Sequence, residues 1–314
     1  LSESRSADMR KYILKRLIIS IVTIWIIVTV SFFLLHSLPG DPFSNTRLLS
    51  DEAREQLMSY YGLDKPKWEQ YITYIGNLLH GEFGYSIKYA GQSVGDIIKR
   101  TFPVSAQLGL WAFAISVPVG IFLGIVAAKR RGSALDYTLV AMAAVGVSLP
   151  AFVISTVLQY VFAIKLKWLP SGLWGTPAHM ILPVLALALG SIANRVRNMR
   201  TLTLEIISED YIKTAKAKGL SSFQISMRHM MRNAVIPMIP GFGMELATII
   251  LGSLVVEQIF AVPGMSAYLI DALNGLDYTM ALGIIVFYGI IIVSANFIFD
   301  LIYALAEPRV SLVK

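Results

Sequence analysis

The sequence contains no cysteine and only four histidines. The absence of cysteine excludes a disulfide framework and a thiolate metal site. The histidines are scattered and form no His-Glu-x-x-His pattern, so we expect no metal site. Ser105, Ser148 and Ser155 lie in no nucleophile elbow, and the Gly-x-x-x-x-Gly-Lys-Ser/Thr loop that cradles nucleotide phosphates is missing. These absences predict a chain that is not an enzyme and that binds neither ATP nor another cofactor itself.

Charged residues are also scarce. They make up 15% of the 314 residues, against about 25% in an average soluble domain, while 55% are hydrophobic and the mean hydropathy is +0.64. One helical crossing of a bilayer needs about 20 mostly apolar residues. The sequence therefore predicts an all-α, polytopic membrane protein with six transmembrane helices. The six apolar runs are 13–35, 102–128, 137–164, 180–193, 235–256 and 280–305.

The expected organisation follows from these runs. Residues 1–8 are polar and precede Met9, so we expect them to be an added or flexible tail outside the fold. Residues 9–36 form the first transmembrane helix, which no small-residue cleavage site follows. Residues 37–101 form an extracytoplasmic segment with amphipathic helices. Residues 102–314 form a core of five transmembrane helices, with a cytosolic loop at 195–234.

The positions of the cations predict the orientation. With the amino terminus in the cytosol, two thirds of the 27 Lys and Arg residues lie on the cytosolic side, as the positive-inside rule requires. Six crossings then place both termini in the cytosol. A nucleic-acid interface at 195–232 is disfavoured, because only Tyr211 and Phe223 could stack on bases there.

Helix signals recur in the outer segment. Apolar residues follow Pro66 at helical spacing, which predicts an amphipathic helix on the membrane surface or on the pore. Ser93 and Asp96 fit a capping box that would start the second crossing. We interpret this segment as a structured lid, and a direct role in substrate binding is the alternative.

The cytosolic loop before the fifth crossing has a distinctive pattern. Ser208 is placed to cap a helix with acidic residues in its first turn and Lys216 and Lys218 in its last turn. Gly219 suits the left-handed conformation that ends such a helix, and Ser221 or Ser222 could cap the next one. The pattern predicts a helix, a sharp glycine elbow and a second helix.

These residues resemble the permease subunits of bacterial ABC importers, whose signature is Glu-Ala-Ala, three residues, then Gly. Gly219 matches the Gly and Ala215 the second Ala, whereas Thr214 replaces the first Ala and Lys213 stands where Glu is usual. The stretch Asp210-Tyr-Ile-Lys-Thr-Ala-Lys-Ala-Lys-Gly-Leu220 is similar to the version found in the peptide and nickel branch, as is Arg228-His-x-x-Arg-Asn-Ala-x-x-Pro237.

Other segments resemble the same branch over nearly the whole chain, and they are most similar to the B-type permease of an oligopeptide system. They are Pro39-Gly-Asp-Pro-Phe43, Tyr61-Gly-Leu-Asp-Lys-Pro66, Gly91-Gln-Ser-Val-Gly95, Phe102-Pro-Val-Ser105, Glu257-x-x-Phe-x-x-Pro-Gly264 and Asp300-x-x-Tyr-x-x-x-Glu-Pro-Arg309.

The resemblance implies a type I ABC importer permease that forms half of an oligopeptide pathway in a bacterial plasma membrane. It implies a second homologous permease, two cytosolic ATPases that bind ATP and Mg, and a lipid-anchored or periplasmic peptide-binding protein. The implied ATPase-coupling residues are Glu209, Asp210, Lys213, Thr214, Ala215, Lys216, Gly219, Leu220, Ser221 and Arg228.

Polar side chains within the crossings are costly and therefore informative. Glu245 lies near the middle of the fifth crossing, beside Gly241, Gly243 and Met244, and we expect this group to line the pathway or a gate. A structural hydrogen bond of Glu245 is the equal alternative. Asp300 and Asn296 suggest structural roles, and Gln107 and Gln159 suggest hydrogen bonds between helices.

Three alternatives stay open at this stage. The same branch includes permeases for dipeptides and for nickel or chelated metals. An ion-coupled secondary transporter should show inverted repeats and several intramembrane carboxylates, whereas only Glu245 lies deep in a crossing. A membrane enzyme or assembly scaffold would need a catalytic constellation that the sequence lacks.

Overall fold

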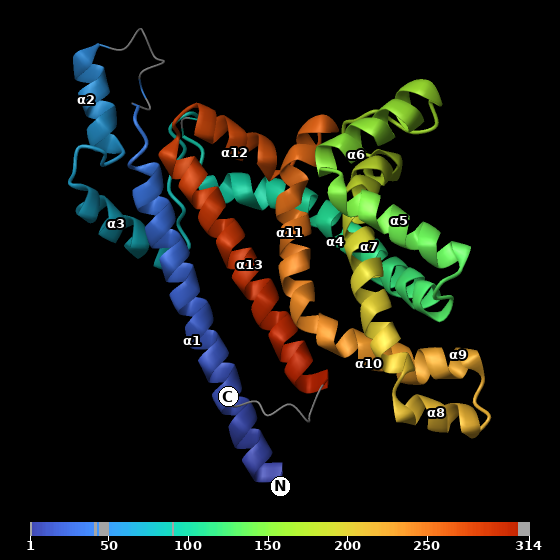
Figure 1. Cartoon of the computed structure of the whole chain (residues 1–314). Helices are drawn as coiled ribbons and strands as arrows, with labels where there is room; N and C mark the ends of the chain where they lie inside the picture. The colour runs from blue at the N-terminus through green and yellow to red at the C-terminus, as the bar shows by residue number, and fades with distance from the viewer. Residues whose placement is uncertain (1, 41–42, 44–49, 90, 307–314) are drawn as a thin grey trace. The chain divides into compact units, whose positions relative to one another are not determined.

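The computed structural model describes residues 2–40, 43, 50–89 and 91–306, and these are helical apart from turns and an isolated bridge between Tyr85 and Ser93 (Figure 1). The helices are α1 Ser2–Leu35, α2 Asp51–Tyr60, α3 Lys67–Leu79, α4 Val94–Lys129, α5 Ala134–Ser148, α6 Ala151–Leu158, η1 Gln159–Lys165, α7 Pro177–Ile207, α8 Asp210–Ala217, α9 Ser222–Ile225, η2 Ser226–Met231, α10 Arg232–Val235, η3 Ile236–Met238, α11 Ile239–Ile259, α12 Met265–Asn274 and α13 Tyr278–Ala306.

Within the described residues, five helical stretches are long and apolar enough to cross a membrane, and there are six if one bent pair of helices is counted as a single span. This confirms an all-α polytopic fold. The five are Met9–Leu35, Val94–Lys129, Pro177–Ile207, Ser222–Ile259 and Tyr278–Ala306.

The third expected crossing, 137–164, is not one straight helix. α5 and the stretch Ala151–Lys165 meet at an angle of 107°. The bend follows from Pro150, which has no N–H to continue the helical ladder and restricts the residue before it to extended conformations. Leu149 accordingly has φ −83° and ψ 124°.

The chain divides into two compact units. The core unit contains the residues up to Leu17, Ser105–Val262 and the chain from Ser294 onward, and the outer unit contains Ile18–Val104 and Pro263–Val293. In the core unit, α4 approaches α7 closely at two glycines. A Cβ on Gly120 would lie 2.7 Å from Arg195 Cβ, and one on Gly124 would lie 2.6 Å from Met199 Cβ. Small residues permit such close packing of membrane helices.

A buried carboxylate fastens the turn between α4 and α5 to α7. Asp136 is 2% exposed and accepts hydrogen bonds from Gly132 N at 3.0 Å and from Arg200 Nε and Nη2 at 2.6 and 2.8 Å. A bidentate pair of this kind fixes the relative orientation of the carboxylate and the guanidinium as well as their separation. Ser133 caps the start of α5 through its hydrogen bond from Asp136 N.

In the outer unit, α3 begins directly after Pro66, as the sequence predicts. Tyr71 attaches α3 to α1, because its hydroxyl hydrogen-bonds Thr29 at 2.7 Å and its ring contacts Phe32 edge-on. α4 likewise begins next to Ser93, at Val94, and continues without a break into its membrane span. The apolar side chains Trp68, Ile72 and Leu79 of α3 are more than half exposed, at 62%, 60% and 82%.

Asp277 joins two distant parts of the outer unit. Its carboxylate is 1% exposed and accepts hydrogen bonds from Ser86 Oγ at 2.5 Å, Ile87 N at 2.9 Å, Lys88 N at 3.0 Å and Met280 N at 3.0 Å. One side chain therefore holds the loop before α4 against the first turn of α13.

We expect Asp277→Asn to loosen this loop without unfolding the chain. The amide offers one acceptor oxygen in place of two and turns a donor toward N–H groups, and hydrogen bonds to charged groups contribute roughly 1.5–3 kcal/mol. Hydrogen exchange measured by mass spectrometry should therefore accelerate about tenfold or more over residues 84–89. Asp96→Asn is the control, since Asp96 is exposed and 3.8 Å from Lys99. Equal protection in both variants would contradict the assignment.

Candidate functional site

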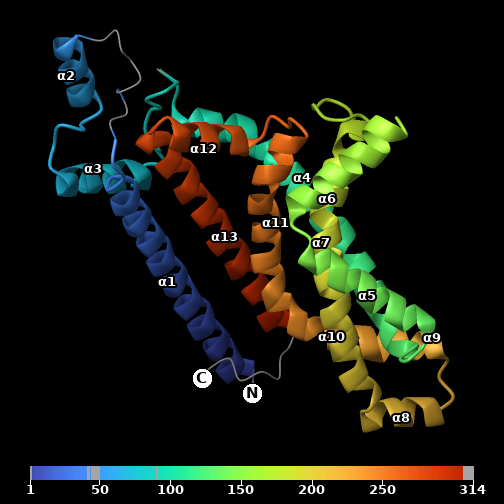
Figure 2. The same cartoon turned by 45° about the horizontal axis from the view of Figure 1, so that its top comes forward.

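The glycine elbow predicted in the cytosolic loop is present. α8 ends at Ala217, Gly219 has φ +76°, and α9 starts at Ser222. Ser221 forms a full capping box with Gln224, since each side chain bonds the other residue's backbone. Figures 1 and 2 show α8 and α9 side by side beyond the end of α7.

Ser208 does not cap the first elbow helix, contrary to the sequence-based expectation. α7 continues to Ile207, so Ser208 is its C-cap residue and donates its hydroxyl hydrogen bond to Glu205 O at 2.6 Å. Glu209 occupies the N-cap position of α8 without a side-chain cap bond. The carbonyls at the end of a long preceding helix compete for the serine hydroxyl.

The elbow is built around a small hydrophobic core, against which Ile206 and Ile207 at the end of α7 also pack. Ile212, Ala215, Ile225 and Met230 are buried together. Ala215, a predicted coupling residue, therefore packs inside the elbow, and Leu220 is half-buried against the same core. The remaining predicted coupling residues are exposed. They are Glu209, Asp210, Lys213, Thr214, Lys216, Gly219, Ser221 and Arg228.

The elbow is continuous with α11. The stretch Ser222–Ile259 passes through the π-helical turn η2 and the short 3₁₀ helix η3 before α11 begins. Pro237 and Pro240 lie at this change of helix type. Irregular turns of this kind often mark hinges and functional sites.

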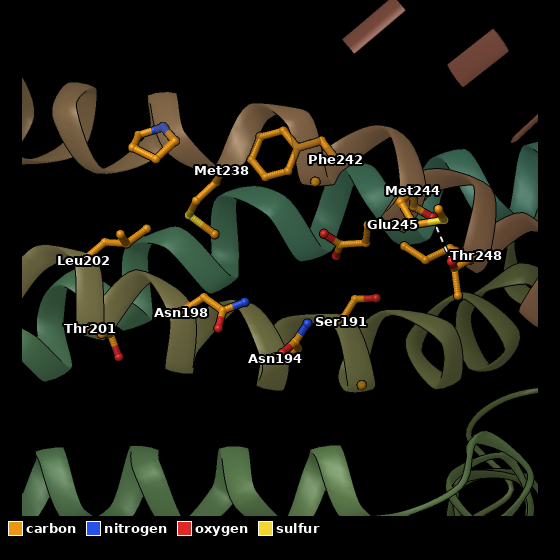
Figure 3. A pocket seen from close by; sticks show the side chains of 14 residues that line it. Ser191, Asn194, Asn198, Thr201, Leu202, Met238, Phe242, Met244, Glu245 and Thr248 are labelled. Carbon is orange, nitrogen blue, oxygen red and sulfur yellow. Dashed lines mark hydrogen bonds between the residues drawn. The ribbon is translucent and has the colours of Figure 1, made fainter. Parts of the chain in front are cut away.

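A cavity of about 690 Å³ lies between α7 and α11 (Figure 3). From α7 it is lined by Ser191, Asn194, Asn198 and Thr201, whose spacing of three and four residues places them on one helical face. Their amides and hydroxyls can both donate and accept hydrogen bonds. The apolar run 180–193 does not predict this polar face, because most of the face lies beyond Ala193, although its helical spacing is visible in the sequence.

The α11 wall includes three of the four residues predicted for the pathway. Gly241, Met244 and Glu245 line the cavity together with Thr248 (Figure 3). Gly243 does not line it. A Cβ on Gly243 would lie 2.7 Å from Asn296 Cα, so this glycine allows α11 to approach α13 instead.

Glu245 is paired with a buried arginine. Arg195 Nη2 donates a hydrogen bond to Glu245 Oε2, and the Arg195 side chain is 1% exposed. The guanidinium lies over the Phe242 ring at 4.4 Å from the centroid and 5.9 Å from that of Phe113. Arg195 was expected in the cytosolic loop, and the structure corrects this: α7 runs through it and buries it against α4 and α11.

Other polar residues of the apolar runs make structural contacts. Asp300 pairs with Arg16 at 3.0 Å, and Gln159 Nε2 donates to Ile259 O at 3.1 Å and to Ser171 O at 2.6 Å. Gln107 lines a separate, mostly apolar groove beside Trp111. The segments Asp41–Pro42 and Glu307–Arg309, which carry part of the family resemblance, lie outside the described residues.

The sequence matches known families along both of its parts. Residues 120–312 match the family described as "Binding-protein-dependent transport system inner membrane component", and residues 9–109 match its amino-terminal region. The dipeptide transport system permease protein DppB of Bacillus subtilis is 42% identical over 306 residues, covering 98% of this chain and 99% of the relative. The oligopeptide transport system permease protein OppB of Haemophilus influenzae is 40% identical over 304 residues, covering 96% and 99%.

A solved structure shares the fold. A chain of the MetNI methionine ABC transporter aligns with a TM-score of 0.50 and 18% sequence identity, covering 67% of this chain and 96% of that one. The family match covers more than half of the sequence, and the relatives cover nearly all of it. This chain therefore belongs to the family of inner membrane components of binding-protein-dependent transport systems.

Proposed function

We propose that this chain forms half of the translocation pathway of an ATP-driven oligopeptide importer. The family implies a second permease, ATPases and a binding protein. We propose in particular a homologous, non-identical permease, two cytosolic ATPases that carry ATP and Mg, and a lipid-anchored or periplasmic binding protein. Permeases for dipeptides or for nickel and metal chelates are the alternative within the family, and an ion-coupled secondary transporter is less favoured.

The observation that carries this proposal is the continuity of the elbow with the cavity wall. An exposed helical hairpin packed around a buried core leads through η2, α10 and η3 into α11, and α11 lines the cavity. Because the hairpin is packed, a force on its exposed surface moves it as one body. Closure of a nucleotide-binding partner against it would then shift α11 relative to α7, as alternating access requires.

The lining of the cavity suits a peptide. Ser191, Asn194, Asn198 and Thr248 provide neutral donors and acceptors that can exchange hydrogen bonds with backbone amides whatever the peptide side chains are. Two relatives are named for dipeptide and oligopeptide transport, which agrees with this lining. We propose that both termini and the elbow lie in the cytosol of a bacterial cell, and the distribution of Lys and Arg supports this orientation under the positive-inside rule.

The orientation predicts which side of the membrane the elbow faces. Because the chain has no cysteine, Lys216→Cys on the exposed face of α8 introduces a unique thiol. An impermeant maleimide should label it in inverted vesicles and not in intact cells. A cysteine at Lys65 in the outer segment should show the reverse pattern. Labelling of Lys216→Cys from outside intact cells would overturn the proposal.

Gly219 gives a matched test of coupling. Gly219 and Gly81 have φ +76° and +80°, and neither has an atom within 4 Å of a built Cβ. A β-branched residue is strained by roughly 1–2 kcal/mol at such angles. We expect Gly219→Val to reduce peptide uptake into vesicles containing the whole complex more than tenfold and to uncouple peptide from ATP hydrolysis. Gly81→Val, with the same strain in the outer segment, should keep both activities. Equal losses would show that strain alone is responsible.

Variants of the Arg195–Glu245 ion pair distinguish a gating role of Glu245 from a purely structural one. Removing one partner of a buried ion pair costs roughly 3–5 kcal/mol, whereas replacing both by apolar residues is often neutral. If Glu245 takes part in gating, Glu245→Gln and the double variant Arg195→Met/Glu245→Met should both lose peptide uptake while the double variant assembles normally. Recovery of uptake in the double variant would leave Glu245 with a structural role. Unchanged uptake and ATPase stimulation in Glu245→Gln would exclude the gate.

A further inference from the structure

A second cavity, of about 490 Å³, lies between α4 and the stretch that follows the elbow glycine. Its lining is apolar except for Lys129 and Ser226, and the Ser226 hydroxyl is already bonded to Ser222 O at 2.8 Å. The residues that form this α4 groove are Val117, Pro118, Ile121, Phe122, Ile125, Val126, Lys129, Phe223, Ser226, Met227 and Met231.

The groove lies at the depth of the bilayer. Its α4 residues follow one helical face inside the membrane span Val94–Lys129, and Lys129 is the last residue of that helix. From Val117 to Lys129 the helix rises about 18 Å, which is more than half of a hydrocarbon core about 30 Å thick. Phe122 and Phe223 are 61% and 71% exposed, so the groove is open to its surroundings. In a membrane, such a surface meets hydrocarbon chains.

The end of the groove is cationic. Lys129 lines the groove, and Arg130 and Arg131 follow it directly in the turn to α5. All three are exposed, and no ion pair is found for them in the described part of the chain. The acidic residue of the same turn, Asp136, is occupied by Arg200 and the Gly132 N–H. Basic pockets between membrane helices on the cytosolic side bind anionic lipid headgroups, and each Lys or Arg near the surface contributes about 1 kcal/mol.

We propose that the α4 groove binds one anionic phospholipid, with an acyl chain along Val117–Val126 and the phosphate at Lys129, Arg130 and Arg131. The apolar lining favours a lipid acyl chain, and the cations favour a negatively charged headgroup. Met227 and Met231 contribute flexible, polarisable side chains that adapt to an acyl chain. Because both lie in η2, between the elbow and α11, the lipid contacts the segment that the proposed function assigns to coupling. The inference rests on that function only for placing the groove on the cytosolic side.

Native mass spectrometry of the whole transporter complex in detergent tests the headgroup. Palmitoyl-oleoyl phosphatidylglycerol should bind, and phosphatidylcholine with the same chains should bind far more weakly. Lys129→Gln should weaken phosphatidylglycerol binding roughly fivefold, and Lys129→Gln/Arg130→Gln/Arg131→Gln by roughly that factor for each cation. Lys165→Gln, which removes an exposed cation at the end of another membrane segment, should have no effect. Equal binding of both lipids, or an unaffected triple variant, would overturn the proposal.

A phosphatidylglycerol with a photoreactive diazirine in its acyl chain tests the position. Crosslinks should map to residues 117–129 and 223–231. Val126→Trp fills the groove and should abolish them, whereas Val145→Trp, at an exposed position of α5, should not. If the Val126→Trp variant fails to assemble, the positions of the crosslinks in the unaltered complex still show whether the acyl chain lies in the α4 groove. Lipid crosslinks elsewhere, or a crosslink from a benzophenone maleimide attached to Phe122→Cys to a neighbouring subunit, would overturn the lipid assignment.

The lipid-binding assays use neither peptide nor ATP. Their outcome therefore does not depend on whether the complex imports peptides. A complex that binds phosphatidylglycerol in the groove without importing peptides would refute only the transport assignment. A complex that imports peptides with an empty groove would refute only this inference.

Discussion

The ion pair between Arg195 and Glu245 is the constraint around which the core unit is organised. Two charges in an apolar span are expensive unless they are paired. In this conformation the pair joins α7 to α11, and the Arg195 side chain fits against α4 because residue 120 is a glycine. Phe242 then covers the guanidinium. In this conformation, one interaction beside the cavity therefore connects three helices that are far apart in the sequence.

The same pair explains how a charged residue can line the cavity without dominating its chemistry. The charge of Glu245 is balanced by Arg195, and its Oε1 atom is buried without a hydrogen-bond partner in the described structure. The accessible polar groups are instead neutral amides and hydroxyls, chiefly on α7. Under the proposed function, such a wall would favour passage of varied peptides over tight binding of one, and selection would rest with the delivering protein.

Local signals in the sequence predicted local structure well. Pro66 fixed the start of α3, Gly219 fixed the elbow, and the apolar runs located the membrane helices, because in each case the determining atoms lie within a few residues. Pro150 was equally visible, yet its 107° bend was not anticipated, since hydropathy averaged over a run does not register a missing N–H.

The contacts that the sequence did not predict are those between residues far apart along the chain. Arg195 was read as part of a basic loop, because nothing nearby in the sequence reveals a carboxylate 50 residues away. Gly243 was grouped with the pathway residues next to it in sequence, whereas the structure packs it closely against Asn296 of α13. Asp277 received no role, since its partners Ser86, Ile87 and Lys88 lie about 190 positions earlier.

The segment between the elbow and α11 has to satisfy two opposing requirements under the proposed function. It must be stiff enough to transmit motion and deformable enough to let α11 change its angle. The buried core formed by α8, α9 and Met230 of η2 provides stiffness. The π-helical turn η2 and the 3₁₀ helix η3, which contains Pro237, interrupt the regular α-helical hydrogen-bond ladder that would resist bending. An acyl chain packed against Met227 and Met231 would contact this deformable segment. A small change in packing there would have the greatest effect on the transmission of motion from the elbow to α11.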